Sequence, residues 1–157
     1  MTTIAVFSDS HGRTSHMLEA VRTYSPDVLI HLGDYARDAR ELAETFPDIP
    51  LYAVRGNCDP PSDTMPETLQ TELEGHRLFM THGHRYNVKL GLDPLLNCAH
   101  FSGAGLVLFG HTHRAVLAET GNMYVLNPGS AGAGSGSSFA LIKLMPDTAP
   151  DCRIIPL

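Results

Sequence analysis

Seven side chains of the kinds that bind metal ions lie in five short polar clusters along the 157-residue chain. The clusters read SDSH, GDY, RGNCD, THGH and GHTH, and each directly follows a run of apolar residues. Their carboxylate, amide and imidazole groups suit a divalent ion that activates water. We therefore predict a metal-dependent hydrolytic site whose ligands are Asp9, His11, Asp34, Asn57, His82, His111 and His113.

The composition of this ligand set indicates two metal ions rather than one. Two Asp, one Asn and four His side chains divide into two four-ligand sets if Asp34 belongs to both. Gly33 has no side chain, so the Asp34 carboxylate and its backbone can approach an ion closely. Such mixed oxygen and nitrogen ligands fit manganese, iron, zinc, nickel or cobalt better than calcium, and we expect Mn²⁺.

The distribution of the nine histidines supports a site. Five of them lie in the polar clusters, namely His11, His82, His84, His111 and His113. His16, His76 and His100 lie outside the clusters and are expected to be ordinary surface residues. His31 lies inside an apolar run, where we expect it to bond to backbone or to support a ligand.

The apolar runs predict the elements that position these clusters. Runs of four to six apolar residues ended by glycine and polar residues are typical of buried strands, and layered α/β folds build their sites at strand ends. Residues 17–24 and 36–46 have helical spacing and alternate with strands at 4–7, 28–32 and 51–54. This alternation favours a parallel sheet at the N-terminal end of the chain.

The second half of the chain predicts more strands. Residues 68–73 and 76–81 flank the turn candidate Glu74-Gly75 and should form a hairpin, and a helix at 93–101 precedes a strand at 106–109. Further strands are expected at 115–119, 123–126, 139–144 and 153–155, in an antiparallel pattern. We predict two mixed sheets packed face to face, with helices outside and the polar clusters at one rim.

Length and composition limit the class of protein. A chain of 157 residues fits one domain, 1–157, and contains no apolar run long enough to cross a bilayer. The N-terminus does not resemble a signal peptide, and three cysteines at unrelated spacings fit a reducing cytoplasm. The formal charge of −6 and the lack of a basic run count against strong nucleic-acid binding.

The ordered motifs DSH, GDY, GNCD, THGH and GHTH resemble those of the calcineurin-like metallophosphoesterases, in particular their compact bacterial and archaeal phosphodiesterase branch. The resemblance implies a four-layer α/β/β/α sandwich with a dinuclear site at one edge. It implies that Asp34 and a hydroxide bridge the ions, the hydroxide being the nucleophile. One ion would be held by Asp9, His11, Asp34 and His113, and the other by Asp34, Asn57, His82 and His111.

One residue departs from the pattern of many relatives. Where they have GNH, with a histidine proposed to protonate the leaving group, this chain has Cys58. A thiol with a pKa of ~8.5 is a poor acid for an alkoxide, so we expect activated esters or diesters to be preferred over alkyl monoesters. His84 is a candidate replacement, Asn57 can also contact a phosphate oxygen, and Asp59 is expected to orient Asn57 or His84.

Other functions and the substrate stay open at this point. A small retromer subunit of the same fold acts mainly as a binding platform, so an interaction scaffold is one alternative, and a phosphomonoesterase or nuclease is another. We expect a small phosphate ester as substrate, and a homo-oligomer is possible.

The segment 129–138, GSAGAGSGSS, is expected to be a surface loop, with a backbone cradle near the site as the rival interpretation. Candidate substrate contacts at the rim are Tyr35, Arg37, Arg55, Arg85, Tyr86 and Arg114.

Overall fold

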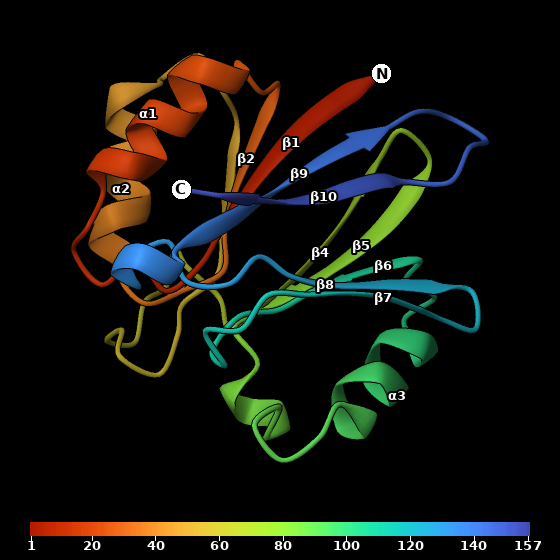
Figure 1. Cartoon of the computed structure of the whole chain (residues 1–157). Helices are drawn as coiled ribbons and strands as arrows, with labels where there is room; N and C mark the ends of the chain where they lie inside the picture. The colour runs from red at the N-terminus through yellow and green to blue at the C-terminus, as the bar shows by residue number, and fades with distance from the viewer.

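A computed structural model describes residues 1–157, and its strands form two five-stranded sheets (Figure 1). The first sheet has the order β10-β9-β1-β2-β3. Its strands are β1 (Thr2–Phe7), β2 (Val28–His31), β3 (Leu51–Ala53), β9 (Ser138–Leu144) and β10 (Asp151–Pro156). The strands β1, β2 and β3 run parallel, whereas β9 and β10 are antiparallel to their neighbours.

The second sheet has the order β4-β5-β6-β8-β7. Its strands are β4 (Thr68–Leu73), β5 (His76–Thr81), β6 (Leu106–Leu108), β7 (Val116–Thr120) and β8 (Met123–Asn127). The central strands β5, β6 and β8 are parallel, and the outer strands β4 and β7 are antiparallel to them. Each sheet is therefore mixed, with a parallel centre.

The two sheets pack face to face around a cluster of 14 buried side chains that both sheets contribute, among them Ile4, Ile30, Met80 and Leu108. Helices α1 (Ser15–Tyr24) and α2 (Ala36–Thr45) cover the outer face of the first sheet, and α3 (Asp93–Phe101) covers the second (Figure 1). The predicted α/β/β/α sandwich is confirmed.

Each helix buries one apolar stripe. Met17, Ala20 and Val21 of α1 recur at helical spacing and are buried against the first sheet. In α3, Leu95 and Ala99 lie four residues apart and pack on the second sheet, and Pro94 occupies the first turn, where a missing N–H is tolerated. No helix is long and apolar enough to cross a membrane.

The predicted elements agree with the observed ones except at some ends. The hairpin β4–β5 and the helix α3 have the predicted bounds. Helix α1 begins two residues earlier than the apolar pattern predicted, and α2 ends one residue earlier, at Thr45. Strand β8 pairs antiparallel with β7, as predicted, and also pairs parallel with β6, which was not predicted. Two short 3-10 helices, His84–Tyr86 and Gly134–Gly136, were not predicted.

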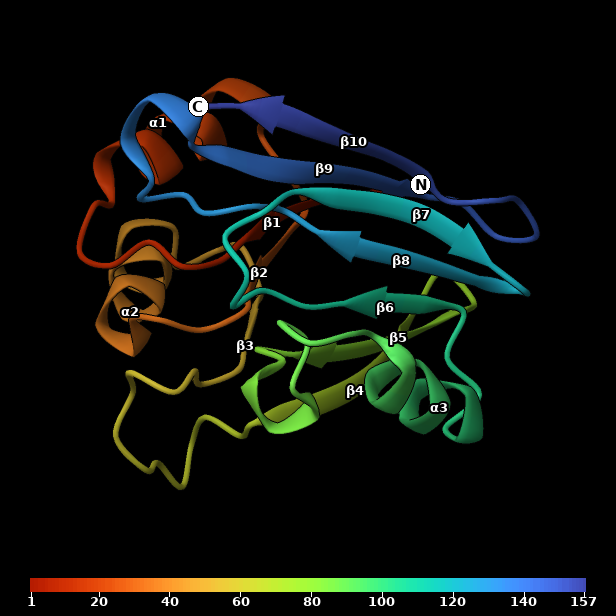
Figure 2. The ribbon, with the colours of Figure 1, turned by 60° about the horizontal axis from the view of Figure 1, so that its bottom comes forward.

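The topology brings the polar clusters together. They follow β1, β2 and β3 in one sheet and β5 and β6 in the other. Parallel strands end at the same edge of their sheet, so the five turns meet at one end of the sandwich (Figure 2).

Candidate active site

The predicted ligands sit on unusual backbone. Nine residues other than glycine have positive φ angles, and five of these are predicted ligands: Asp9 (54°), His11 (48°), Asp34 (49°), His111 (67°) and His113 (59°). The left-handed region is unfavourable for residues with a Cβ and persists only where the surrounding structure enforces it. The turns after β1, β2 and β6 thus direct these side chains at the cost of local backbone strain.

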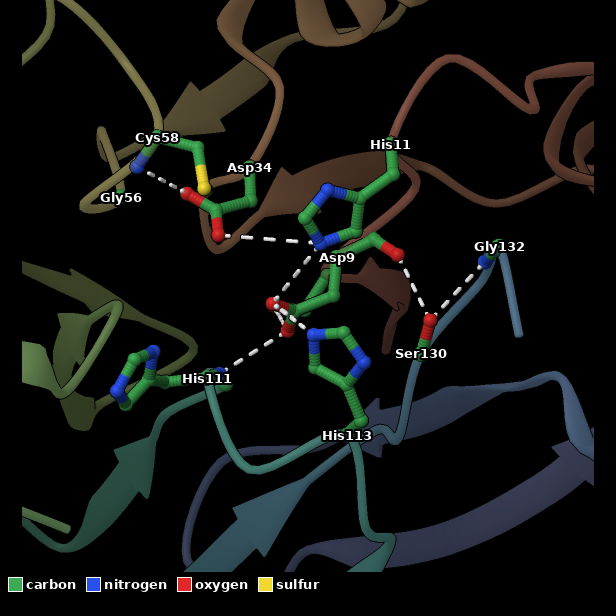
Figure 3. A network of polar contacts seen from close by, with 12 residues as sticks. Asp9, His11, Asp34, Gly56, Cys58, His111, His113, Ser130 and Gly132 are labelled. Carbon is green, nitrogen blue, oxygen red and sulfur yellow. Dashed lines mark hydrogen bonds and ion pairs between the residues drawn. The ribbon is translucent and has the colours of Figure 1, made fainter. Parts of the chain in front are cut away.

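One group of ligand atoms surrounds the Asp9 carboxylate (Figure 3). Asp9 Oδ1 lies 3.1 Å from His113 Nε2 and 3.8 Å from His11 Nε2. His11 Nε2 also lies 3.8 Å from Asp34 Oδ2. Residues from three separate turns therefore present oxygen and nitrogen atoms to one small volume.

A second group lies on the other side of Asp34. His82 Nε2 is 3.4 Å from Asp34 Oδ2 and 3.1 Å from Asn57 Oδ1. The same nitrogen is 3.8 Å from Asp9 Oδ1. A single oxygen, Asp34 Oδ2, thus lies within 4 Å of an imidazole nitrogen from each group.

Each carboxylate has one oxygen held by the protein and one free. Asp9 Oδ2 accepts hydrogen bonds from the Ser8 hydroxyl (2.6 Å) and the His111 backbone N–H (3.0 Å). Asp34 Oδ1 accepts one from the Cys58 backbone N–H (3.0 Å). The hydrogen bonds fix both carboxylates while Asp9 Oδ1 and Asp34 Oδ2 face the imidazoles.

The donor set fits divalent metal ions. Asp9 Oδ1 and His11 Nε2 are buried without a hydrogen-bond partner, although buried polar atoms are normally paired. His82 Nδ1 donates to the Leu32 carbonyl at 2.7 Å, which leaves Nε2 of the neutral ring as an acceptor facing other acceptors. A cation among these lone pairs satisfies all of them.

The close packing of these groups shifts the pKa values of Asp34 and His82. Burial alone would raise the pKa of Asp34, but His82 and the Cys58 N–H hold it well below its usual range. Burial opposes protonation of His82, and Asp34 and Asp9 nevertheless raise its pKa above the ordinary value. The site is therefore an anionic pocket that attracts positive charge.

Two predicted residues lie further out. The His111 ring stands 5.0 Å from the His82 ring, and Figure 3 shows it extending away from the Asp9 carboxylate. The His84 ring lies 5.5 Å from the His82 ring, and its buried Nδ1 has no partner. Burial lowers the pKa of both histidines, for His111 to about 4.

Cys58 stands at the edge of the site. Its sulfur lies close to ligand atoms of His11 and Asp34, and the residue is exposed (Figure 3). Partial burial and the hydrogen bond to Asp34 raise the pKa of the thiol. This agrees with the expectation that Cys58 is a poor proton donor to a leaving group.

A buried chain of hydrogen bonds supports the turn between Asp9 and His11. The Gly33 N–H donates to His31 Nδ1, so the neutral ring of His31 donates from Nε2 to the Ser10 hydroxyl at 2.9 Å. Ser10 donates in turn to Asp38 Oδ2 at 2.7 Å, which also accepts the Gly12 N–H. His31 is the expected supporting residue, whereas Asp38 was missed because its role depends on folding.

The expectation for Asp59 is wrong. Its carboxylate accepts the backbone N–H groups of Asp34 (3.0 Å), Ala36 (2.7 Å) and Gly56 (2.7 Å) rather than orienting Asn57 or His84. It therefore ties the turn after β2 to the turn after β3. Gly56 is required there, because a Cβ would collide with Asp34 Oδ1.

The segment 129–138 is not simply a surface loop. Ser130 is buried and donates to the Asp9 carbonyl at 2.8 Å, and the Gly132 N–H reaches the same oxygen at 3.3 Å. Only residues 133–136 are exposed. The segment supports the backbone of Asp9, a predicted ligand, so the surface-loop expectation is wrong for its first half.

A carboxylate missed by sequence reasoning organises one part of the rim. Glu67 pairs with Arg55 (3.0 Å) and Arg85 (3.1 Å) and lies 3.8 Å from His84 Nε2. These two arginines are therefore engaged, and Tyr86 packs on Phe79. The remaining rim candidates, Tyr35, Arg37 and Arg114, line hollows beside the ligands.

A sandwich of two mixed sheets that gathers acidic and imidazole ligands at one end is the architecture of a metal-dependent phosphoesterase. The chain matches the calcineurin-like phosphoesterase superfamily domain over residues 2–146 and belongs to that family. Divalent metal ions are therefore implied, and the cluster residues are positioned to bind them.

Curated relatives carry names of the same kind. The chain is 31% identical over 152 residues to the probable metallophosphoesterase YsnB of Bacillus subtilis, covering 93% of this chain and 86% of that one. It is also 31% identical over 156 residues to the phosphodiesterase YfcE of Escherichia coli K12, covering 85% and 81%. These names support hydrolase activity.

Solved structures confirm the fold. A predicted phosphoesterase from Streptococcus pneumoniae superposes with a TM-score of 0.82 at 28% identity, covering 99% of this chain and 89% of that one. Vps29 of Entamoeba histolytica, solved in complex with Zn²⁺, gives a TM-score of 0.77 at 19% identity and covers 98% of both chains. The second likeness concerns the fold alone.

Proposed function

We propose that the protein is a phosphodiesterase that hydrolyses a small phosphate ester at a site for two divalent ions. The observation that carries the proposal is the position of Asp34 Oδ2, within 4 Å of His11 Nε2 on one side and His82 Nε2 on the other. The unpaired atoms Asp9 Oδ1 and His11 Nε2 add support.

The ligands divide as the family resemblance implies. One ion would be held by Asp9, His11, Asp34 and His113, and the second by Asp34, Asn57, His82 and His111. When bound, two such ions would polarise the phosphoryl oxygens and lower the pKa of a water, so that hydroxide would be available to attack phosphorus. The protein holds the ligands rigidly through Ser8, Ser10, Asp59 and Ser130.

The site lacks an obvious general acid that would protonate the leaving group. The raised pKa of Cys58 disfavours proton donation, and outside the predicted ligands His84 has a buried nitrogen without a partner. We assign His84 to leaving-group protonation or phosphate orientation, and Asn57 to contact with a phosphoryl oxygen. Diesters with good leaving groups should therefore be hydrolysed faster than alkyl monoesters.

The ligand chemistry also supports a choice of metal. Four imidazoles with carboxylate and amide oxygens favour Mn²⁺, with iron, zinc, nickel and cobalt as substitutes. The three cysteines are unpaired, which supports a cytoplasmic location.

The proposal is tested by hydrolysis of bis(p-nitrophenyl) phosphate and p-nitrophenyl phosphate after removal and return of metal. We expect Mn²⁺ to restore turnover, with the diester preferred. Asp34→Asn should abolish that turnover, because it removes the shared oxygen's charge. Asp48→Asn changes an exposed carboxylate outside the predicted ligand set and should retain it.

An interaction scaffold is the competing function, and the likeness to Vps29 is consistent with it. Under that function no metal would restore turnover of either ester, although metal binding itself could persist. Turnover equal in Asp34→Asn and wild-type protein would also contradict the proposal.

A further inference from the structure

A cavity of about 330 Å³ opens beside the ligands, between the start of α2 and the segment that follows β3. Its wall contains Tyr35, Arg37, Arg40, Cys58 and Pro60. In Figure 2 this segment runs from β3 past α2 at the end of the sandwich where the polar clusters meet. The site described above does not use this cavity.

The cavity adjoins the predicted metal ligands through two residues of its wall. The Tyr35 ring lies 5.2 Å from the His11 ring in an edge contact. Cys58, on the same wall, donates its backbone N–H to Asp34 Oδ1. A phosphate ester centred between His11 and Asp34 would therefore extend one of its two organic arms into the cavity.

The cavity carries positive charge that the protein does not neutralise. Arg40 is exposed and forms no ion pair within 4.0 Å. Arg37 lies 5.2 Å above the Tyr35 ring and reaches Asp38 only at 3.5 Å. Asp38 already accepts the Ser10 hydroxyl and the Gly12 N–H.

The only carboxylate in the wall of the cavity, that of Asp59, is already hydrogen-bonded to backbone. Both oxygens of Asp59 accept backbone N–H groups, at 2.7–3.0 Å. The arrangement differs from the opposite rim, where Glu67 pairs with Arg55 and Arg85. On the α2 side, the Arg40 guanidinium forms no ion pair and is available to a ligand that enters from the catalytic centre.

We propose that this cavity is a substrate subsite for a second phosphate group, carried on one ester arm of the diester. The assignment rests on the proposed phosphodiesterase function and specifies its substrate class, an organic phosphodiester with an additional phosphate. Arginine suits this role because its planar group binds phosphate oxygens in pairs. Tyr35 and Arg37 form the side of the cavity nearest the ligands, and Arg40 meets the second phosphate.

The test uses two chromogenic diesters that differ by one phosphate. Thymidine 5′-(p-nitrophenyl phosphate) is compared with the same ester bearing a 3′-phosphate, both with Mn²⁺-reconstituted protein. We expect kcat/KM to be about tenfold higher for the ester with the 3′-phosphate, mainly through KM. Arg40→Gln should remove this preference while turnover of bis(p-nitrophenyl) phosphate stays unchanged.

Two other arginines serve as matched variants. Arg22 lies on α1, and the Arg22→Gln variant should keep the preference for the ester with the 3′-phosphate. Arg114→Gln changes the hollow on the opposite side of the ligands and should also keep it. Equal kcat/KM for the two thymidine esters, a preference that survives Arg40→Gln, or its loss in Arg114→Gln would each overturn the subsite.

Binding separates this inference from the proposed function. Calorimetry compares the affinities of thymidine 3′,5′-bisphosphate and thymidine 5′-phosphate, which needs no turnover. A preference for the bisphosphate that Arg40→Gln removes supports the subsite even if no ester is hydrolysed. Equal affinities in wild-type protein would overturn it even if bis(p-nitrophenyl) phosphate is hydrolysed well.

Discussion

Asp34 has the most demanding position in the site, since one of its oxygens is fixed by the Cys58 N–H and the other lies between two imidazoles. The residue has a positive φ angle, and its backbone N–H is held by Asp59. Small neighbours are needed for this geometry. The close approach of Gly56 shows how little room remains.

Gly56→Ala tests that requirement. The new Cβ would collide with Asp34 Oδ1, and displacement of a ligand by about 1 Å costs on the order of 100-fold in rate. We expect kcat/KM for bis(p-nitrophenyl) phosphate to fall by about that factor. Gly91→Ala is the control, because nothing lies within 4 Å of its added Cβ. Equal activity in the two variants would contradict the close packing.

His31 gives a prediction about pH. Burial lowers its pKa from 6.5 to about 4, so between these values the unfolded chain binds a proton that the folded chain does not. The free energy of unfolding should therefore fall as the pH drops from 6.5 to 4, by about 3 kcal/mol from this residue. Denaturation in EDTA should show a weaker dependence for His31→Gln. The same dependence in both proteins would contradict a neutral, buried His31.

The predicted ligands and their supporting residues differ in how visible they are in the sequence. Asp9, His11 and the other predicted ligands lie in the turns after strands, so local pattern is sufficient to propose them. Asp38, Glu67 and Ser130 act through partners 12 to 121 residues away. No local pattern distinguishes such residues from ordinary surface positions before the chain folds.

At the scale of elements, the order and direction of the strands determine where the predicted ligands meet. Strands β1, β2 and β3 are parallel, as are β5 and β6, and their ends meet because the two sheets pack face to face. The helix and strand bounds follow from apolar spacing and from turns such as Glu74-Gly75. The parallel pairing of β8 with β6 could not be predicted, because the sequence shows only its hairpin with β7.

The segment 129–138 has a testable supporting role. Ser130→Ala removes a buried hydrogen bond to the Asp9 carbonyl, which should lower the free energy of unfolding by about 1 kcal/mol and Tm by about 2–4 °C. Ser135→Ala changes an exposed serine of the same segment and should leave Tm unchanged. Thermal denaturation compares them, and equal Tm values would show that the segment does not support Asp9.

At the scale of the whole molecule, the charge of −6 is less informative than its distribution. Buried carboxylates at the ligand end favour cations, whereas the free arginine of α2 stands beside them. Bound ions would reverse the local sign of the site and make it attractive to phosphate. Net charge therefore does not argue against an anionic substrate.

Metal binding should stabilise the folded chain as a whole. A ligand at 100 times its Kd contributes about 2.7 kcal/mol per site, or about 5.4 kcal/mol for two sites, so Mn²⁺ should raise Tm over its value in EDTA by about 10–20 °C. Asp34→Asn should lose most of this rise, and Asp48→Asn should keep it. A rise of the same size in Asp34→Asn would place the metal elsewhere.

The most direct test of the central claim is a titration of metal-free protein with Mn²⁺ while hydrolysis of bis(p-nitrophenyl) phosphate is followed. A site that shares Asp34 between two ions predicts that the rate rises until two equivalents per chain are bound and then stays constant. A rate that saturates at one equivalent would contradict the dinuclear site, and no turnover at any metal concentration would contradict the phosphodiesterase itself.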